Sequence, residues 1–183
     1  MDLMEDMKRR ARVLHRAARA GDPAALARLR GLREWRAFSD DQLREQVRRR
    51  HCLSILARAL GLDGWSHLSL LWNQPEARDF GTLLYPPSCG GHWNIWSAAY
   101  EEAGEIRAQH GGFLLPYRHQ FVIVEASFIE DLGLDPSAAE WSACGRDWVA
   151  PRDFAARHRL CRRVLALRGE SVGALALTSA RVA

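Results

Sequence analysis

A stretch rich in proline and glycine, residues 73–91, separates two halves of the chain with different residue patterns. It holds three prolines and three glycines and shows neither a helical nor a strand period. Before it, apolar residues recur every three or four positions, as in amphipathic helices. After it, helical patterns alternate with short aromatic and β-branched runs that are typical of strands.

These patterns predict an α+β protein that is mainly α. We expect a basic α-helical region over 1–74, which forms an N-terminal helical bundle. A small α+β domain over 75–170 should follow, with a β-α-β-β unit and C-terminal helices. The small, apolar residues over 171–183 carry no capping signal and predict a weakly ordered tail.

Local signals in the first half place the ends of helices. Gly21 should end a first helix over 5–20, and Asp22-Pro23 should begin a short second one. Ser39 and Gln42 form a capping box that opens the longest helix of the bundle. That helix should run to Leu60, where Gly61 can adopt a positive φ.

The second half should contain three strands, at 93–96, 113–115 and 120–125. Ser97 should cap a helix between the first two strands, and Gly111-Gly112 should end it. Short helices are expected over 128–132, 136–144 and 151–167.

Positive charge is concentrated in the first half. Residues 1–74 hold 15 Lys or Arg and 9 Asp or Glu, whereas residues 75–183 hold 11 and 13. Such a half permits an acidic partner, nucleic acid included, although a solvated helical face is the simpler interpretation. A helix-turn-helix is disfavoured because its recognition helix, over 66–73, would contain no Lys or Arg.

The sequence predicts a cytoplasmic protein with no membrane partner. Its N-terminus is acidic where a signal peptide needs cations, and no apolar run approaches 18 residues. The four cysteines lie far apart and are expected to be free thiols in a reducing compartment; they are Cys52, Cys89, Cys144 and Cys161.

The densest group of chemically capable residues is Cys89-Gly-Gly-His-Trp-Asn-Ile-Trp96. If 92–96 form a strand, then His92, Asn94 and Trp96 share one face. An imidazole, an amide and an indole suit a small polar ligand that lies against an aromatic wall. The turn between the next two strands offers further binding groups, which are Tyr117, Arg118 and His119.

Two chemical alternatives use the same region. His92 could act as a base or nucleophile of a small enzyme, with Cys89 beside it. Cys89 and His92 could also join His158 and Cys161 in a zinc site, since both pairs have a two-residue gap. No cofactor or metal is favoured, because the spacing differs from that of a standard zinc finger and no common nucleotide-binding or hydrolase signature is present.

Two segments resemble known families. Residues 50–65 are similar to a short helical segment found ahead of bacterial glyoxalase-like domains and in bacterial ankyrin-repeat proteins, which implies a helical accessory unit. Residues 92–152, with the motifs HWNIW, GGFLLPY, QFVIV, LGLDP and GRDW, resemble a family of uncharacterised bacterial proteins. The second resemblance implies a bacterial protein and assigns no activity. A glyoxalase activity is not implied, because the chain lacks repeated βαβββ modules.

From these features we expect a binding module for a small polar ligand or a protein partner. The alternatives that remain open are a small enzyme based on His92 and a nucleic-acid-associated protein that uses the N-terminal arginines. Nucleic acid is the less favoured partner.

Overall fold

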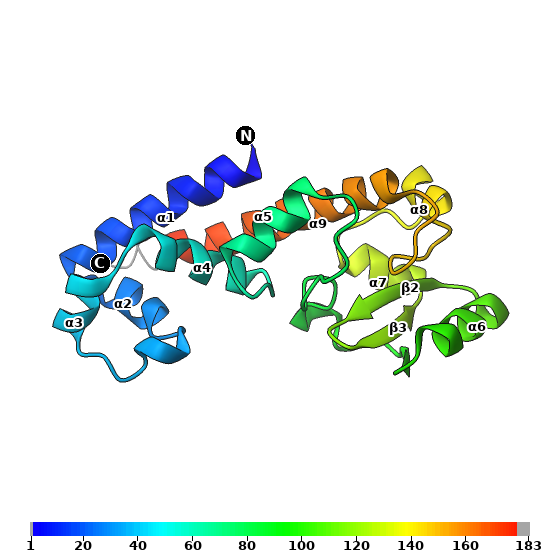
Figure 1. Cartoon of the computed structure of the whole chain (residues 1–183), viewed down its shortest axis with the longest axis horizontal. Coiled ribbons are helices and arrows are strands. Elements are labelled where there is room, and N and C mark those ends of the chain that lie inside the picture. The colour runs from blue at the N-terminus through cyan, green and yellow to red at the C-terminus, as the bar shows by residue number, and fades with distance from the viewer. Residues whose placement is uncertain (1, 179–183) are drawn as a thin grey trace. The chain divides into compact units, whose positions relative to one another are not determined.

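A computed structural model describes residues 2–178 and shows an α+β protein that is mainly α. Its contacts divide the described chain into two units (Figure 1). Unit 1 contains the residues up to Ser69 and those from Arg168 onward, and unit 2 is Leu70–Leu167. None of the described helices combines the length and the apolar character needed to cross a bilayer.

Unit 1 is built from helices: α1 (Leu3–Ala20), α2 (Pro23–Leu29), the 3-10 helix η1 (Arg33–Trp35), α3 (Asp40–Gln46), α4 (Arg49–Ala59) and the start of α5 (Trp65–Asn73). α1 contacts α2, α3 and α4. Its apolar stripe is fully buried at Met7, Ala11 and Ala18, and Leu29 and Leu43 of the neighbouring helices are buried with it. The N-terminal helical bundle predicted from the sequence is confirmed.

In unit 1, the helix ends predicted at Gly21, Asp22 and Ser39 are confirmed. Gly21 follows α1 with a φ of 87° and donates its N–H to the last turn. The side chain of Asp22 accepts a hydrogen bond from the N–H of Ala25 at 2.7 Å, which caps α2. Both bonds of the capping box between Ser39 and Gln42 are present at the start of α3.

The prediction of one long helix from Ser39 to Leu60 is wrong, because the chain leaves the helix at Val47 and Arg48. Val47 has a ψ of 135° and Arg48 a ψ of 156°, both extended. The freed carbonyl oxygen of Val47 lies 3.3 Å from His15 Nε2 and accepts a hydrogen bond from Arg48 Nη1 at 3.1 Å. The N–H of Arg48 donates to His51 Nδ1. Side chains therefore replace the helical bonds that the break removes.

Unit 2 combines a small sheet with short helices: η2 (Pro87–Cys89), β1 (Ile95–Ser97), α6 (Tyr100–His110), β2 (Phe113–Tyr117), β3 (Gln120–Val124), α7 (Ala126–Asp131), α8 (Ala139–Cys144) and the first part of α9 (Phe154–Thr178). The strands are antiparallel in the order β1-β3-β2. The central strand is buried at Val122, Ile123 and Val124, as its continuous apolar run predicts.

The register of the sheet assigns its side chains to two faces. Ile123 and Leu114 pack with Ala103 of α6, which covers one face. On the opposite face, Phe113 of β2 makes an edge contact with Trp141 of α8 at 4.8 Å between ring centroids. Figure 1 shows α6 and α7 next to β2 and β3.

The strand and cap expected around Ser97 are shifted. β1 spans Ile95–Ser97, so His92 and Asn94 precede the strand. α6 begins at Tyr100, and Ser97 is not its N-cap. Instead the hydroxyl of Ser97 is held in a turn, where it accepts a hydrogen bond from the N–H of Ala99.

A guanidinium fixes the last helix to the rest of unit 2. Arg157 of α9 is 1% exposed. It donates to three carbonyl oxygens, those of Trp148 (3.0 Å), Pro75 (2.6 Å) and Ala77 (2.7 Å). The proline-rich segment lacks secondary structure of its own at this point, so these bonds give it a defined position.

α9 is longer than the sequence predicts. It begins three residues after Pro151, where Asp153 accepts hydrogen bonds from two N–H groups of the first turn. It then continues to Thr178, so residues 171–178 of the expected tail have helical backbone. Residues 179–183 of that tail lie outside the described residues.

All four cysteines are buried, and none of them forms a disulfide. Burial raises the pKa of Cys52 and Cys144 to about 11 and that of Cys161 to about 12. A thiol with such a pKa holds its proton at neutral pH and is a poor nucleophile or metal ligand.

Candidate functional site

Aromatic rings from four segments of unit 2 meet on the sheet face opposite α6. The ring of Tyr85, from the proline-rich segment, lies 5.2 Å from that of Trp96 and 5.4 Å from that of Tyr117. Trp96 and Tyr117 are themselves 5.5 Å apart. On its other side, Tyr85 contacts Phe128 of α7 at 5.3 Å. Edge-on and tilted ring contacts of this kind form a rigid apolar body.

Asn94 places an amide beside these rings. Its Nδ2 donates to the hydroxyl of Tyr85 and to the backbone oxygen of His92, both at 3.2 Å. Its Oδ1 is buried and accepts no hydrogen bond from the described residues. A buried acceptor without a donor costs about 1–3 kcal/mol, so this oxygen is an energetically favourable place for a donor.

His92 forms a polar pair with Asp131 at the end of α7. His92 Nε2 lies 2.7 Å from Asp131 Oδ2. A carboxylate can only accept, so in this pair Nε2 carries the proton and Nδ1 is the ring's other polar atom. The His92 ring also packs against Phe128 at 5.4 Å. The Asp131 side chain is 56% exposed, which leaves it accessible to a second donor.

Large apolar side chains are exposed on and before β1. Trp93 is 99% exposed, Ile95 43% and Trp96 40%. Trp96 differs from Trp93 because its ring is also held by two tyrosines. We use the name aromatic–polar surface for the group that these contacts join: Tyr85, His92, Asn94, Trp96, Tyr117 and Asp131.

The three residues predicted at the turn between β2 and β3 lie in different environments. Tyr117 ends β2 and belongs to the aromatic–polar surface. Arg118 adopts a φ of 53° in the two-residue turn, and its guanidinium lies 5.6 Å from the centroid of the Tyr117 ring. His119 is exposed and makes no hydrogen bond or ring contact within the described residues. Of the three predicted residues, Tyr117 therefore belongs to the aromatic–polar surface and Arg118 lies at its edge.

Cys89 and the proposed zinc ligands do not meet. Cys89 is fully buried, so its thiol is not presented to a substrate beside His92. His158 Nε2 lies 2.9 Å from the carbonyl oxygen of Trp72, and Cys161 is buried in α9. Within the described part of the chain, no cluster of three potential metal ligands contains Cys89, His92, His158 or Cys161.

Sequence reasoning missed Tyr85, Phe128 and Asp131. Tyr85 stands in a segment without periodicity, and Asp131 reads as an ordinary acidic residue near a helix end. Each contributes through a contact between positions distant in the chain. The one local signal is the pair Pro86-Pro87, which restricts the backbone that follows Tyr85.

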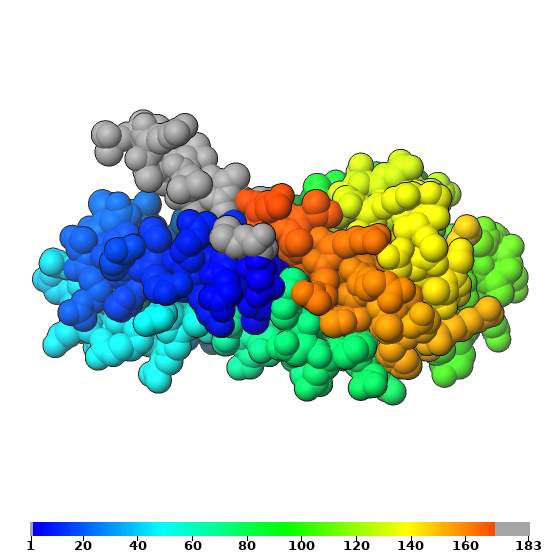
Figure 2. All heavy atoms as spheres, turned by 90° about the horizontal axis from the view of Figure 1, so that it is seen from above, coloured from blue at the N-terminus to red at the C-terminus, as the bar shows by residue number. Residues whose placement is uncertain are grey.

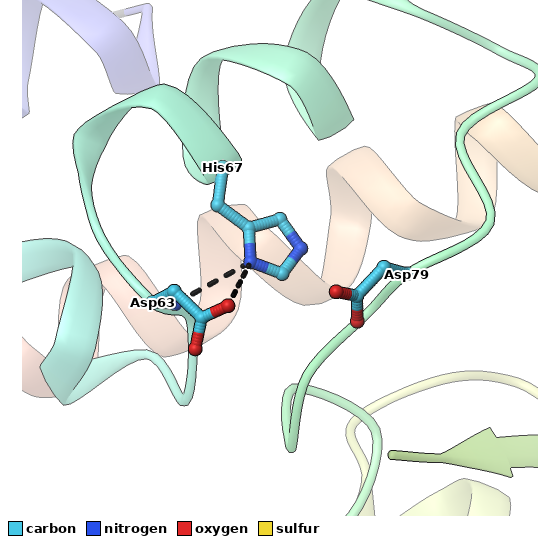
Figure 3. A group of neighbouring side chains, drawn as sticks. All are labelled: Asp63, His67 and Asp79. Atoms are coloured by element: carbon cyan, nitrogen blue, oxygen red, sulfur yellow. Dashed lines mark hydrogen bonds and ion pairs between the residues drawn. The ribbon is translucent and has the colours of Figure 1, made fainter. Parts of the chain in front are cut away.

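Unit 1 contains a pocket of about 420 Å³ that the sequence did not indicate. It is lined by α4, the following turn and the first turn of α5: Arg50, Leu53, Ser54, Asp63, Gly64, Trp65, Ser66 and His67. His67 Nδ1 accepts a hydrogen bond from the N–H of Asp63 at 3.4 Å and lies 3.7 Å from its carboxylate (Figure 3). Asp79, also drawn there, belongs to unit 2.

Comparisons with family models, curated proteins and solved structures gave no match to this chain.

Proposed function

We propose that unit 2 is a binding module for a small ligand with a flat apolar body and a head group that donates hydrogen bonds. The observation that carries this proposal is the buried, undonated Oδ1 of Asn94, whose amide bonds to Tyr85, the tyrosine that contacts the partly exposed ring of Trp96. The ring offers a stacking face, and the amide oxygen offers an acceptor. Small-ligand sites commonly combine an apolar wall with a few polar groups that fix orientation.

The charge of the head group follows from the same residues. Asn94 Oδ1 accepts, and Asp131 carries a carboxylate that is more than half exposed. A protonated amine can donate to either acceptor and is attracted by the carboxylate. A carboxylate head would be repelled. The proposal therefore favours an amine over an alcohol and disfavours an acid.

Three probes that share one ring test this order: tyramine, 4-hydroxyphenethyl alcohol and 4-hydroxyphenylacetate. In NMR titrations of the full chain, tyramine should shift the indole N–H signal of Trp96 most and the acid least. Trp96→Ala should remove tyramine binding, whereas Trp93→Ala, which removes an equally large but almost fully exposed ring, should retain it. Equal shifts for all three probes, or equal loss in both variants, would reject the site.

The His92–Asp131 pair supports a second candidate, general-base catalysis. A histidine oriented by a carboxylate is a common arrangement for accepting a proton from a nucleophile. Hydrolysis of 4-nitrophenyl acetate above the buffer rate should then be lost in His92→Gln and retained in His119→Gln, which changes an exposed histidine. The buried Cys89 makes no contribution to this candidate.

A further inference from the structure

α1 of unit 1 presents a row of arginines on the side of the helix next to α3 and α4. Arg12, Arg16 and Arg19 are spaced by four and three residues, so they lie on one helix face. All three are exposed. His15 lies between them in the sequence and approaches the carbonyl oxygen of Val47 at 3.3 Å. That contact shows that the row of arginines runs beside the segment between α3 and α4.

Two further arginines extend this row onto α3 and the start of α4. Arg44 Nε donates to the backbone oxygen of Arg19 at 3.4 Å. Arg48 donates to the same Val47 oxygen that His15 approaches. We call Arg12, Arg16, Arg19, Arg44 and Arg48 the arginine strip. Figure 2 shows the dark blue α1 adjoining the cyan segment that contains α3 and the start of α4.

Carboxylates compensate little of this charge. Arg44 is paired with Asp41 at 3.4 Å, but both side chains are exposed, and such a pair contributes little. The other four arginines of the strip form no ion pair with a described carboxylate. α3 also carries the exposed Glu45 and Asp40, and Asp40 is paired with Arg30, which lies outside the strip. Burial, and then the charges of Arg50 and Arg48, lower the pKa of His51, as expected in a positive local field.

We propose that the arginine strip binds the phosphate backbone of a nucleic-acid duplex. Guanidinium groups donate in a planar fork that matches phosphate oxygens. A single-strand binder would need aromatic rings on which bases stack. None of the large apolar side chains exposed in the described part of unit 1 is aromatic.

A lipid surface fits this strip less well. Peripheral helices that lie on membranes insert an apolar face beside their basic face. The apolar face of α1, from Met7 to Ala18, is buried in the bundle instead. Val13 is the exposed large apolar residue on α1, and it lies one position, about 100°, around the helix from Arg12.

The test measures binding of the full chain to a labelled 16-base-pair duplex, as DNA and as RNA, by fluorescence anisotropy between 50 and 200 mM NaCl. If each guanidinium of the strip neutralises one phosphate, the slope of log K against log salt is about −4.5. The affinity then falls roughly 500-fold over that range. The two duplexes distinguish a DNA partner from an RNA partner, and binding of either supports the proposal.

Matched variants locate the contact. Arg12→Gln with Arg16→Gln and Arg19→Gln should reduce the slope to about −1.8. Arg152→Gln with Arg159→Gln and Arg163→Gln removes the same charge from unit 2 and should leave the slope unchanged. Circular dichroism checks that each variant folds. If the triple variant does not fold, the single variant Arg16→Gln replaces it, and the slope of log K against log salt should then change by about 0.9.

Four results would overturn the proposal. They are a flat salt dependence, equal weakening by both triple variants, tighter binding to a 16-nucleotide single strand than to the duplex, and binding to phosphatidylserine vesicles under conditions where neither duplex binds.

Discussion

Unit 1 buries mainly aliphatic side chains between helices, whereas unit 2 buries aromatic rings and a guanidinium around a small sheet. The four largest fully buried side chains all belong to unit 2: Trp141, Trp148, Arg157 and Phe128. Unit 2 also exposes the indoles of Trp93 and Trp96, whereas none of the large apolar side chains exposed in the described part of unit 1 is aromatic. The comparison teaches that unit 2 depends on specific polar bonds, while unit 1 depends on volume and helix ends.

The largest effect is expected from the buried guanidinium of unit 2. Arg157→Met keeps much of the volume but leaves the carbonyl oxygens of Pro75, Ala77 and Trp148 without their donor. Because each buried acceptor costs about 1–3 kcal/mol, the free energy of unfolding should fall by about 3–5 kcal/mol. Urea denaturation followed by tryptophan fluorescence measures it.

The exposed Arg159 on the same helix provides the matched control for that change. Arg159→Met should cost less than about 0.5 kcal/mol. Equal losses in the two variants would show that the buried bonds do not hold unit 2 together.

The stability of unit 1 should be most sensitive to a loss of buried side-chain volume. Leu14 is buried in the bundle, while its neighbour Val13 is half exposed. Leu14→Ala should lower the free energy of unfolding by about 2–4 kcal/mol, because it removes buried methyl groups and leaves a cavity. Val13→Ala should change it by less than about 0.5 kcal/mol. Thermal melts of both variants test the assignment, and a reversed order would place the wrong face of α1 in the core.

Loss of a helix cap should have a smaller effect. Ser39→Ala removes the side-chain acceptor of the capping box at the start of α3. The expected loss is about 1 kcal/mol, measured by urea denaturation. Ser137→Ala, which changes an exposed serine outside any helix, serves as the control; an unaltered midpoint in Ser39→Ala would mean that the cap contributes nothing.

The smallest effect is the contribution of Tyr100, in unit 2, to the pH dependence of stability. Burial and the hydrogen bond to Asp147 raise the pKa of Tyr100 to about 12. Above pH 10 the unfolded chain loses this proton while the folded chain keeps it, so stability should decrease between pH 10 and 12. Denaturation at pH 9 and pH 11 should show a larger drop in the native chain than in Tyr100→Phe. Parallel curves for the two proteins would contradict this origin.

The parts of the fold that follow local rules could be predicted from the sequence. Gly21, Asp22 and Ser39 fix helix ends through bonds that span four residues or fewer. The burial of β3 on both faces followed from its apolar run. The break at Val47 could not be predicted in this way, because it depends on His15, more than thirty positions earlier in the chain.

The candidate site was predictable only in part for the same physical reason. Four predicted site residues do meet, and each has a polar or aromatic side chain that stands out in the sequence. They are His92, Asn94 and Trp96 from the segment after Gly90-Gly91, and Tyr117 at the turn. Asn94, Trp96 and Tyr117 meet through Tyr85, which no local pattern marks, and His92 joins them through the bond from Asn94 to its backbone oxygen. The expected alternation of a strand did not bring them together, since His92 and Asn94 precede β1. The contacts of Tyr85 with residues later in the chain bring them together instead.

One measurement tests most directly whether the two units carry separate binding surfaces. It is an NMR titration of the full, isotope-labelled chain with the duplex and, separately, with tyramine. We predict that the duplex shifts amide signals of α1, α3 and the start of α4, while tyramine shifts Asn94 and the indole of Trp96. If both additions shift one common set of residues, or if neither shifts any, the two units do not carry separate binding surfaces.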